Sequence, residues 1–557
     1  MNGVWSQPYY LFGRGLGFSA LLAVIPTLLL LYLLAVKRKP SWIAALAGLA
    51  ATFVLAKFAY GMSLVHTVSS TALGASFGIF PITWIVFWAI VLYEITVITG
   101  KFEIIKDSIG SITSDKRMQA LLIAFAFGAF LEGCAGFGTP VAVAAAMMVG
   151  LGFSSLYASS ICLLANTAPV AFGSIGIPLV TLAAITGLPV AQLSGVAGRL
   201  TFPFSLCLPA YLILVTSGFS ATLEVWPAVL TCGVVFAGIQ LTISNFIGPQ
   251  LADILSSVGA MAALVLLLRF WEPRHTNPHD VEVDASMKAA SDDLPIRAHD
   301  HRTPPHYSSR DLWLAWMPYA FLVVFVLAWG YPPITARLNS VSHAFPWPGL
   351  HNQILRMPPV VSAPAKYAAL FNFNWLSASG TSCMLAALLA AVFCGMSPAS
   401  FSTVIFSVAR KLIKPTVTVS AMLAMAYLMN YSGATGTLGL AFSATGHVFP
   451  FFSPIMGWLG VFLTGSDTSS NALFGNLQVV SATRLGLDPI LIAAANSIGG
   501  VMGKMISLQT IAVAAAATGM STADQAKLFR FTLKHSILLA SLVGVEVFLY
   551  AYVFHPH

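Results

Sequence analysis

Long apolar stretches separated by short polar segments run through this sequence from end to end. Most hold about 18 to 22 residues, the length that an α-helix needs to cross the hydrocarbon core of a bilayer. The candidate crossings are residues 16–36, 42–60, 82–99, 155–190, 200–216, 226–244, 250–270, 313–332, 375–395, 416–432, 488–520 and 533–554. This pattern predicts an all-α polytopic membrane protein with about twelve transmembrane crossings.

Two further apolar stretches, residues 118–151 and 454–483, are interpreted as re-entrant hairpins that enter and leave the membrane on the same side. The reason is the distribution of Lys and Arg, which are enriched in cytoplasmic loops. Basic clusters lie at residues 37–39, 101–117, 269–310, 410–414 and 527–534. All these clusters face the cytoplasm only if the two stretches do not cross, and both chain termini then lie in the periplasm.

The composition agrees with a membrane location. Hydrophobic residues make up 57% of the 557 residues and charged residues only 8%, whereas soluble domains hold about 25% charged residues. The formal net charge is +8, but the basic residues flank apolar stretches, where they set the orientation in the bilayer. Nucleic-acid binding is therefore not expected.

One long hydrophilic segment, residues 271–312, divides the chain into an N-terminal half, 1–270, and a C-terminal half, 313–557. The segment carries five histidines. Their spacing matches no strong pattern of metal ligands, so no metal site is expected there. We expect a flexible cytoplasmic linker between the halves.

The two halves contain related segments. FGAFLEG at 127–133 recurs as LGVFLTG at 459–465, and Asn166 and Asn496 follow at similar distances. Basic residues directly precede the hairpin in the first copy but precede the span before it in the second, so the copies have opposite orientations. Such inverted repeats are typical of secondary transporters. The first repeat pairs hairpin 118–151 with broken span 155–190, and the second pairs hairpin 454–483 with broken span 488–520.

Four Gly-rich or polar interruptions break the apolar stretches of the repeats. They are GCAGFGTP (133–140), TAPVAFGSIGIP (167–178), TGSDTSSN (464–471) and SIGGVMGK (497–504). Non-helical backbone at membrane depth requires surrounding protein or a wet cavity, so the four should converge near the midplane. Thr139 is the predicted N-cap before Pro140, and Ser469 or Ser470 is the predicted N-cap in the second hairpin. Helix N-termini there would suit a small carboxylate.

Three charged residues at the interruptions carry candidate chemistry. Lys504 is a deeply placed cation that can balance a bound carboxylate. Glu132 lies where the neutral acid is favoured, which suits proton coupling; alternatively, it caps backbone donors or pairs with Lys504 as structure. Asp467 could couple protons, repel anions at a gate or form a turn. The expected substrate-binding residues are Gly136, Gly138, Thr139, Asn166, Thr167, Ser466, Thr468, Ser469, Ser470, Asn471, Asn496 and Lys504. The alternative role of the polar ones is only to satisfy backbone groups freed at the breaks, and we expect this role for about half of them.

The motifs FLEGCAGFGTPVAVAAAMMVGLGF, NTAPVAFGSIGIP, FFSPIMGWLGVFLTGSDTSSNALF and GKMIS resemble the bacterial L-lactate permease family, which includes glycolate permeases. The resemblance implies proton symport of lactate, glycolate and related 2-hydroxy monocarboxylates across the bacterial inner membrane. It also implies a moving transport unit that carries the hairpins against a static scaffold, with alternating access. The histidine-rich segment 271–312 and Glu546 depart from the family pattern.

Other functions remain open at this point. A sodium-coupled carboxylate carrier is the main alternative, because Asn, Thr and Ser at unwound breaks also suit Na⁺. An anion channel with the hairpin tips as its filter is less expected. An enzyme is not expected, because the spans carry no His cluster and no nucleophile–base pair. The expected partners are a small carboxylate, the lipid bilayer and a second copy in a homodimer, with no cofactor besides the coupling ion.

Overall fold

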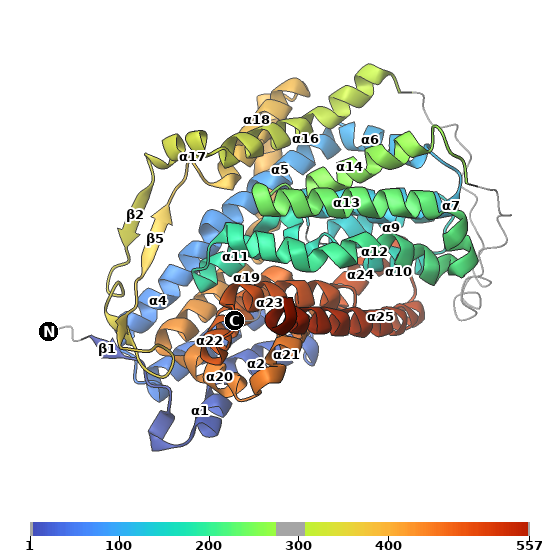
Figure 1. Cartoon of the computed structure of the whole chain (residues 1–557). Helices are drawn as coiled ribbons and strands as arrows, with labels where there is room; N and C mark the ends of the chain where they lie inside the picture. The colour runs from blue at the N-terminus through green and yellow to red at the C-terminus, as the bar shows by residue number, and fades with distance from the viewer. Residues whose placement is uncertain (1–3, 137, 274–306, 555–557) are drawn as a thin grey trace.

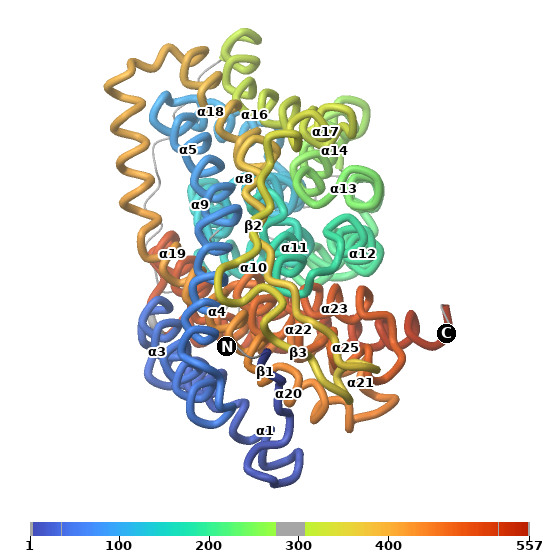
Figure 2. Tube along the Cα trace, turned by 90° about the vertical axis from the view of Figure 1, so that its left-hand side faces the viewer, coloured from blue at the N-terminus to red at the C-terminus, as the bar shows by residue number. Residues whose placement is uncertain are grey.

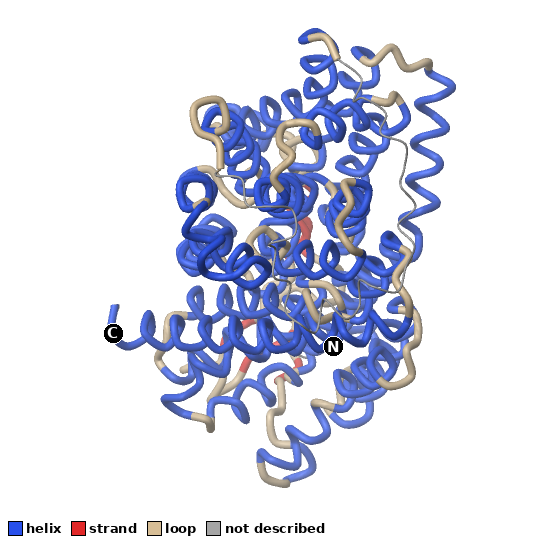
Figure 3. The backbone as a smooth tube through the Cα atoms, turned by 90° about the vertical axis from the view of Figure 1, so that its right-hand side faces the viewer, coloured by secondary structure: helices blue, strands red, loops and turns tan. Residues whose placement is uncertain are grey.

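The computed structural model describes residues 4–136, 138–273 and 307–554, which fold almost entirely into helices (Figures 1 and 3). Within these residues, 11 helices are long and apolar enough to cross a membrane, or 12 if the bent pair Ser155–Ala165 and Val170–Thr186 forms one span. The chain is therefore a multi-pass membrane protein. Most of the predicted linker 271–312 lies outside the described residues.

Most of the helices follow one another with short connections. Before residue 273 they are α1 (Leu16–Ala23), α2 (Ile25–Ala35), α3 (Ser41–Val54), α4 (Leu64–Phe77), α5 (Trp84–Ile98), α6 (Lys101–Gly110), α7 (Lys116–Gln119), α8 (Gly128–Cys134), α9 (Thr139–Gly150), α10 (Ser155–Ala165), α11 (Gly173–Thr186), α12 (Val190–Glu224), α13 (Trp226–Phe246) and α14 (Ala252–Leu267). After residue 306 they are α16 (Ser309–Gly330), α17 (Pro332–Asn339), α18 (Ser379–Phe393), α19 (Pro398–Ser432), α20 (Ala434–Ser443), α21 (Phe449–Thr464), α22 (Asp467–Leu485), α23 (Pro489–Lys504), α24 (Leu508–Thr518) and α25 (Thr522–Leu549). Short 3₁₀ or π segments are η1 (Leu11–Gly13), η2 (Leu55–Ala59), η3 (Gly78–Thr83), η4 (Ala120–Phe127), η5 (Val170–Phe172), η6 (Gly446–Val448) and η7 (Tyr550–Phe554).

Two stretches that the charge pattern suggested as loops are helical. α4 occupies most of 61–81, and the hydroxyls of Thr67 and Ser70 each donate to a carbonyl oxygen one turn earlier, at 2.8 Å, so these polar side chains are satisfied within the helix. The basic cluster 410–414 lies inside α19, which rises along one edge of the molecule (Figure 2). Its lysines and arginine are exposed there, so helix geometry accommodates them without a loop.

Five short strands add a small β layer that the all-α prediction did not include. They are β1 (Trp5–Ser6), β2 (His343–Pro346), β3 (Ile354–Arg356), β4 (Ala365–Lys366) and β5 (Leu370–Phe373). β1 pairs in parallel with β3, β3 pairs antiparallel with β4, and β2 and β5 form a separate antiparallel ribbon. The ribbon lies along one end of the molecule, beyond the helices (Figure 1).

The two predicted repeats contain the same order of elements. The first helix pair, residues 116–150, breaks between α8 and α9 and leads into the first broken span, α10 and α11. The second helix pair, α21 and α22, breaks at 465–466 and leads into the second broken span, α23 and α24. Contacts between the copies are reciprocal, because α11 packs against α22 while α24 packs against α9. Each broken span therefore contacts the helix pair of the other copy.

Glycines allow α21 and α23 to approach very closely. A Cβ at Gly457 would lie 1.8 Å from the carbonyl oxygen of Asn496, and a Cβ at Gly499 would lie 1.9 Å from that of Pro454. Small residues at such positions let membrane helices pack backbone to backbone. The second helix pair therefore packs closely against its broken span.

We expect Gly457→Ala to disrupt folding, because the added methyl group meets backbone that cannot move aside, and overpacking of this kind costs about 1–3 kcal/mol or more. The measurement is the yield of monodisperse protein in size-exclusion chromatography after extraction in detergent. Gly238→Ala in α13 is the matched control, because nothing lies within 4 Å of a Cβ there. Equal yields for the two variants would contradict the close packing of α21 on α23.

Candidate functional site

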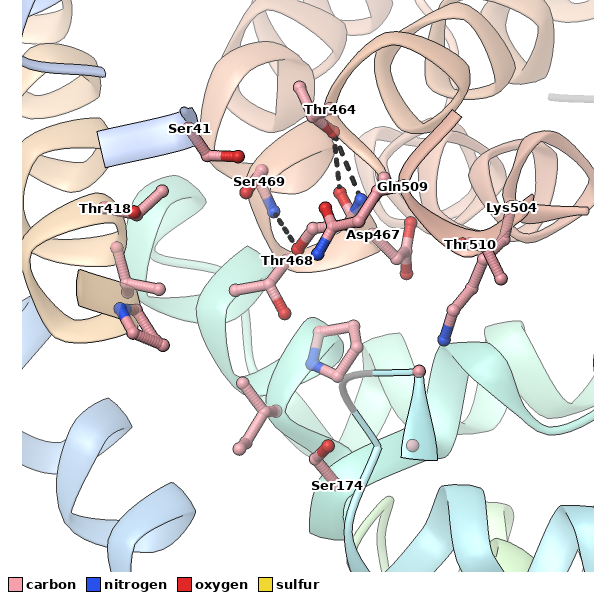
Figure 4. Close-up of a pocket in the computed structure, with 18 of the residues that line it drawn as sticks. Ser41, Ser174, Thr418, Thr464, Asp467, Thr468, Ser469, Lys504, Gln509 and Thr510 are labelled. Carbon is pink, nitrogen blue, oxygen red and sulfur yellow. Dashed lines mark hydrogen bonds between the residues drawn. The ribbon is translucent and has the colours of Figure 1, made fainter. Parts of the chain in front are cut away.

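Residues from both helix pairs and both broken spans line one cavity of about 270 Å³ (Figure 4). The first repeat contributes Glu132, Gly138, Val170, Gly173, Ser174, Ile177 and Pro178. The second repeat contributes Thr464, Gly465, Ser466, Asp467, Thr468, Ser469, Lys504, Gln509, Thr510 and Val513. α3 and α19 complete the wall with Ser41, Trp42, Lys414, Pro415, Thr418, Val419 and Met422. Segments more than 300 residues apart in sequence therefore meet at this cavity.

The two helix pairs restart their helices earlier than the sequence predicted. Gly138 precedes α9 in the left-handed conformation, with a φ of 84°, so Thr139 is the first helical residue and not the N-cap. In the second pair the N-cap is Ser466, whose Oγ accepts a hydrogen bond from the N–H of Ser469 at 3.3 Å. Ser469 and Ser470 are consequently inside α22. The earlier start follows from the acid Asp467 in the first turn, a position favoured by the helix dipole.

The break in the second broken span is also displaced from the prediction. SIGGVMGK is helical up to Lys504, and the interruption falls at residues 505–507. The glycines there serve close packing instead, because a Cβ at Gly503 would lie 2.4 Å from the carbonyl oxygen of Trp458. In the first broken span the predicted interruption is present, with left-handed φ values at Ser174, Ile175 and Gly176.

A buried ion pair joins the two predicted repeats at the cavity wall. Lys504 Nζ donates a hydrogen bond to Glu132 Oε1 at 2.7 Å, and the two side chains are 10% and 4% exposed. Glu132 Oε2 has no hydrogen-bond partner among the described residues. The carboxylate lies against Gly173, where a Cβ would be 2.6 Å from Oε1. The pair therefore lies at the cavity wall, and the second carboxylate oxygen of Glu132 is buried without a hydrogen-bond partner among the described residues.

A second connection joins the helix pair of the second predicted repeat to the broken span of the first. Asn471 Nδ2 donates to the carbonyl oxygen of Pro178 at 3.1 Å, and Asn471 Oδ1 accepts from Asn496 Nδ2 at 2.9 Å. Asp467 Oδ2 accepts a short hydrogen bond from Ser497 Oγ, while Asp467 Oδ1 has no partner among the described residues. This network fixes the start of α22 on α23 and leaves one carboxylate oxygen of Asp467 unpartnered.

Half of the predicted site residues line the cavity and half do not. Those in the wall are Glu132, Gly138, Ser466, Asp467, Thr468, Ser469 and Lys504. Those outside it are Gly136, Thr139, Asn166, Thr167, Ser470, Asn471 and Asn496. Two of the residues outside the wall satisfy backbone carbonyl groups. The hydroxyl of Thr167 donates to the carbonyl oxygen of Leu164, and the hydroxyl of Ser470 donates to that of Gly457. Asn166 is 5% exposed, and neither of its side-chain polar atoms has a described hydrogen-bond partner.

Several cavity residues were missed by the sequence reasoning. Gln509 and Thr510 lie just past the displaced break, so their position depended on where α24 begins. Lys414 was assigned to a loop. Asp253 does not line the cavity, but it is a second buried acid close to the first break, 1% exposed, with its Cβ 3.0 Å from a Cβ placed at Gly133. An acid inside the apolar stretch 250–270 was a sufficient signal for it.

Comparisons with known proteins identify the family of this chain. The profile of the family described as L-lactate permease matches residues 19–554. The chain is 43% identical to the L-lactate permease of Bacillus subtilis over 99% of both chains. It is 42% identical to the glycolate permease GlcA of Escherichia coli over 99% of this chain and 98% of that one. The L-lactate permease of the same organism is also 42% identical, with the same coverage. The chain therefore belongs to the L-lactate permease family.

Proposed function

We propose that this chain imports L-lactate, glycolate or related 2-hydroxy monocarboxylates by proton symport with alternating access. Membership of a family of permeases, with relatives named for lactate and for glycolate, supports transport of this substrate class. The observation that carries the coupling mechanism is the ion pair between Lys504 and Glu132 at the wall of the shared cavity.

Lys504 is the proposed anchor for the substrate carboxylate. It ends α23, and its ammonium group reaches the cavity while only 10% of the side chain is exposed. A charge-assisted hydrogen bond in such a place is about twice as strong as a neutral one. The N-terminus of α22 adds N–H donors beside Ser466 and Thr468, which favour an anion in the same space.

Glu132 is the proposed proton carrier. In the empty site its carboxylate neutralises Lys504, so the pair carries no net charge. A substrate carboxylate that takes over Lys504 leaves Glu132 as a buried anion without a counter-charge, which costs several kcal/mol. Binding one proton to Glu132 removes this cost. Binding of one anion is thus linked to the uptake of one proton. The net charge of the site is zero both when it is empty and when it is loaded.

Asp467 is proposed to contribute to the same charge balance. It lines the cavity and lies within electrostatic range of both Lys504 and Glu132. Its hydrogen bonds to Ser497 and Asn471 tie the start of α22 to α23. A proton on its unpartnered oxygen would allow an anion to bind nearby without repulsion.

The proposed moving unit consists of the two helix pairs and the two broken spans. Their reciprocal contacts, α11 with α22 and α24 with α9, are those expected of copies related by a pseudo-two-fold axis, and they support inverted repeats with re-entrant hairpins. The remaining helices would form the scaffold. Lys504 and Glu132 both belong to this unit, whereas Ser41, Trp42 and Lys414 belong to the scaffold, so movement of the unit against the scaffold changes the access to the cavity.

We place the protein in the bacterial inner membrane with both termini in the periplasm. The basic cluster 37–39 then faces the cytoplasm. Ser41 and Trp42, which follow that cluster directly, line the cavity together with the exposed Lys414. We infer that this end of the cavity is the cytoplasmic end.

Uptake of labelled L-lactate into liposomes tests the coupling ion. We expect the purified protein to accumulate lactate when the outside is more acidic than the inside, because protons then flow inward with the anion. A sodium gradient without a pH gradient should give no accumulation. Accumulation driven by sodium alone would replace the proposal by a sodium-coupled carrier. Flux that does not saturate with lactate concentration would indicate a channel.

A further inference from the structure

The proposed substrates share a feature that the ion pair does not explain. Lactate and glycolate both carry a hydroxyl group on the carbon next to the carboxylate, and they differ by one methyl group. A site that selects them over the corresponding simple acids needs a group that recognises this hydroxyl, in addition to a carboxylate anchor. This inference rests on the proposed function.

Most polar side chains around the cavity already use their hydrogen-bonding capacity within the protein. Thr464 Oγ1 donates to the carbonyl oxygen of Gly460 at 2.7 Å, and Ser466 Oγ accepts from the N–H of Ser469. Thr510 Oγ1 and Ser507 Oγ lie 2.7 Å apart in a hydrogen bond. These groups hold the backbone of the two breaks in place and have little hydrogen-bonding capacity left for a ligand.

Gln509 differs from them. Its amide has no hydrogen-bond partner among the described residues, although it lines the cavity and is exposed to it. Oε1 lies at the turn of the second helix pair, 2.7 Å from a Cβ placed at Gly465. That glycine has a φ of 75°, a conformation that L side chains rarely adopt,. The turn thus leaves room for the glutamine side chain above it.

Gln509 and Lys504 stand on opposite sides of the short break at 505–507 and reach the same cavity (Figure 4). The hydrogen bonds between Ser507 and Thr510 fix the start of α24, and Gln509 lies in its first turn. Both side chains line one cavity of about 270 Å³, which is large enough for a small ligand with an anionic group and a neutral polar group on adjacent carbons.

We propose that Gln509 recognises the 2-hydroxyl group of the substrate while Lys504 holds its carboxylate. An amide offers both a donor and an acceptor, and a hydroxyl group can use both. The third carbon of lactate then faces the apolar part of the wall, formed by Val170, Ile177 and Val513. An apolar wall discriminates weakly between a methyl group and a hydrogen, so lactate and glycolate are both accepted.

Exchange of labelled lactate in liposomes without a pH gradient tests this role, with propionate and acetate as competitors that lack the hydroxyl. We expect Gln509→Met, which keeps the length of the side chain but removes the amide, to raise the half-saturation concentration for lactate about tenfold. The inhibition constant of propionate should not change. The preference of the wild-type protein for lactate over propionate should fall by the same factor.

Thr418→Val is the matched control, because its hydroxyl also lines the cavity but donates to the carbonyl oxygen of Lys414 at 2.8 Å. It should leave the preference for lactate unchanged. Gln509→Leu serves as a second variant, and both are compared with the wild type for their yield of monodisperse protein. Equal weakening of lactate and propionate in the Gln509 variants would overturn the proposal, because it would indicate a packing role against Gly465. A wild-type protein that exchanges neither acid would instead overturn the proposed function.

Discussion

Glu132→Gln should abolish the accumulation of lactate driven by a pH gradient while leaving lactate exchange intact. Glutamine keeps the shape of the side chain and can still accept a hydrogen bond from Lys504, but it cannot take up a proton. The anion then binds to Lys504 without displacing a carboxylate, so loading no longer requires a proton. Exchange needs no net proton movement and therefore continues. Net transport of lactate becomes the movement of one negative charge and responds to membrane potential.

The measurement compares two assays on the same liposomes: uptake under an acid-outside gradient, and exchange at equal pH on both sides. Glu94→Gln is the matched control, because Glu94 also forms an ion pair inside a candidate span, with Lys411 at 2.6 Å, but does not line the cavity. It should retain both activities. If Glu132→Gln still concentrates lactate under the pH gradient, the coupling proton resides elsewhere, and Asp467 becomes the residue to replace next.

The three charged residues of the candidate site could be identified from the sequence because charged residues are rare in this chain. Where only 8% of residues are charged, Glu132, Asp467 and Lys504 stand out within glycine-rich interruptions, and all three line one cavity. Broken helices at membrane depth must be covered by protein or water, and this requirement alone places them together. Asp253 was open to the same reasoning, since it is an acid in an apolar stretch.

The positions of the helix starts could not be predicted, and this uncertainty decided which residues face the cavity. Starting α22 after Ser466 rather than Ser469 changes which N–H groups are free, and it turns Asn471 away from the cavity toward Asn496. Glycine was ambiguous for a physical reason. It permits left-handed turns, as at Gly138, but it also permits close helix packing, as at Gly503. Only tertiary contacts distinguish these two uses.

Lys504→Ala should raise the half-saturation concentration for lactate exchange by about 10²-fold or more. Removing one partner of a buried, hydrogen-bonded charge pair costs about 2–5 kcal/mol in binding, and each 1.4 kcal/mol corresponds to a factor of ten. Lys411→Ala is the control, because this lysine belongs to the ion pair outside the cavity and is 57% exposed.

The single variant also leaves Glu132 without its counter-charge, so a folding defect must be separated from lost affinity. The double variant Glu132→Gln/Lys504→Ala removes both charges and avoids an isolated buried carboxylate, whose cost would otherwise destabilise the fold. We expect the double variant to be recovered as monodisperse protein in wild-type yield and to bind lactate as weakly as Lys504→Ala. A half-saturation concentration that stays at the wild-type value in both variants would mean that helix N-termini alone hold the anion. The ion pair would then be structural, and the link between anion loading and proton uptake would lose its basis.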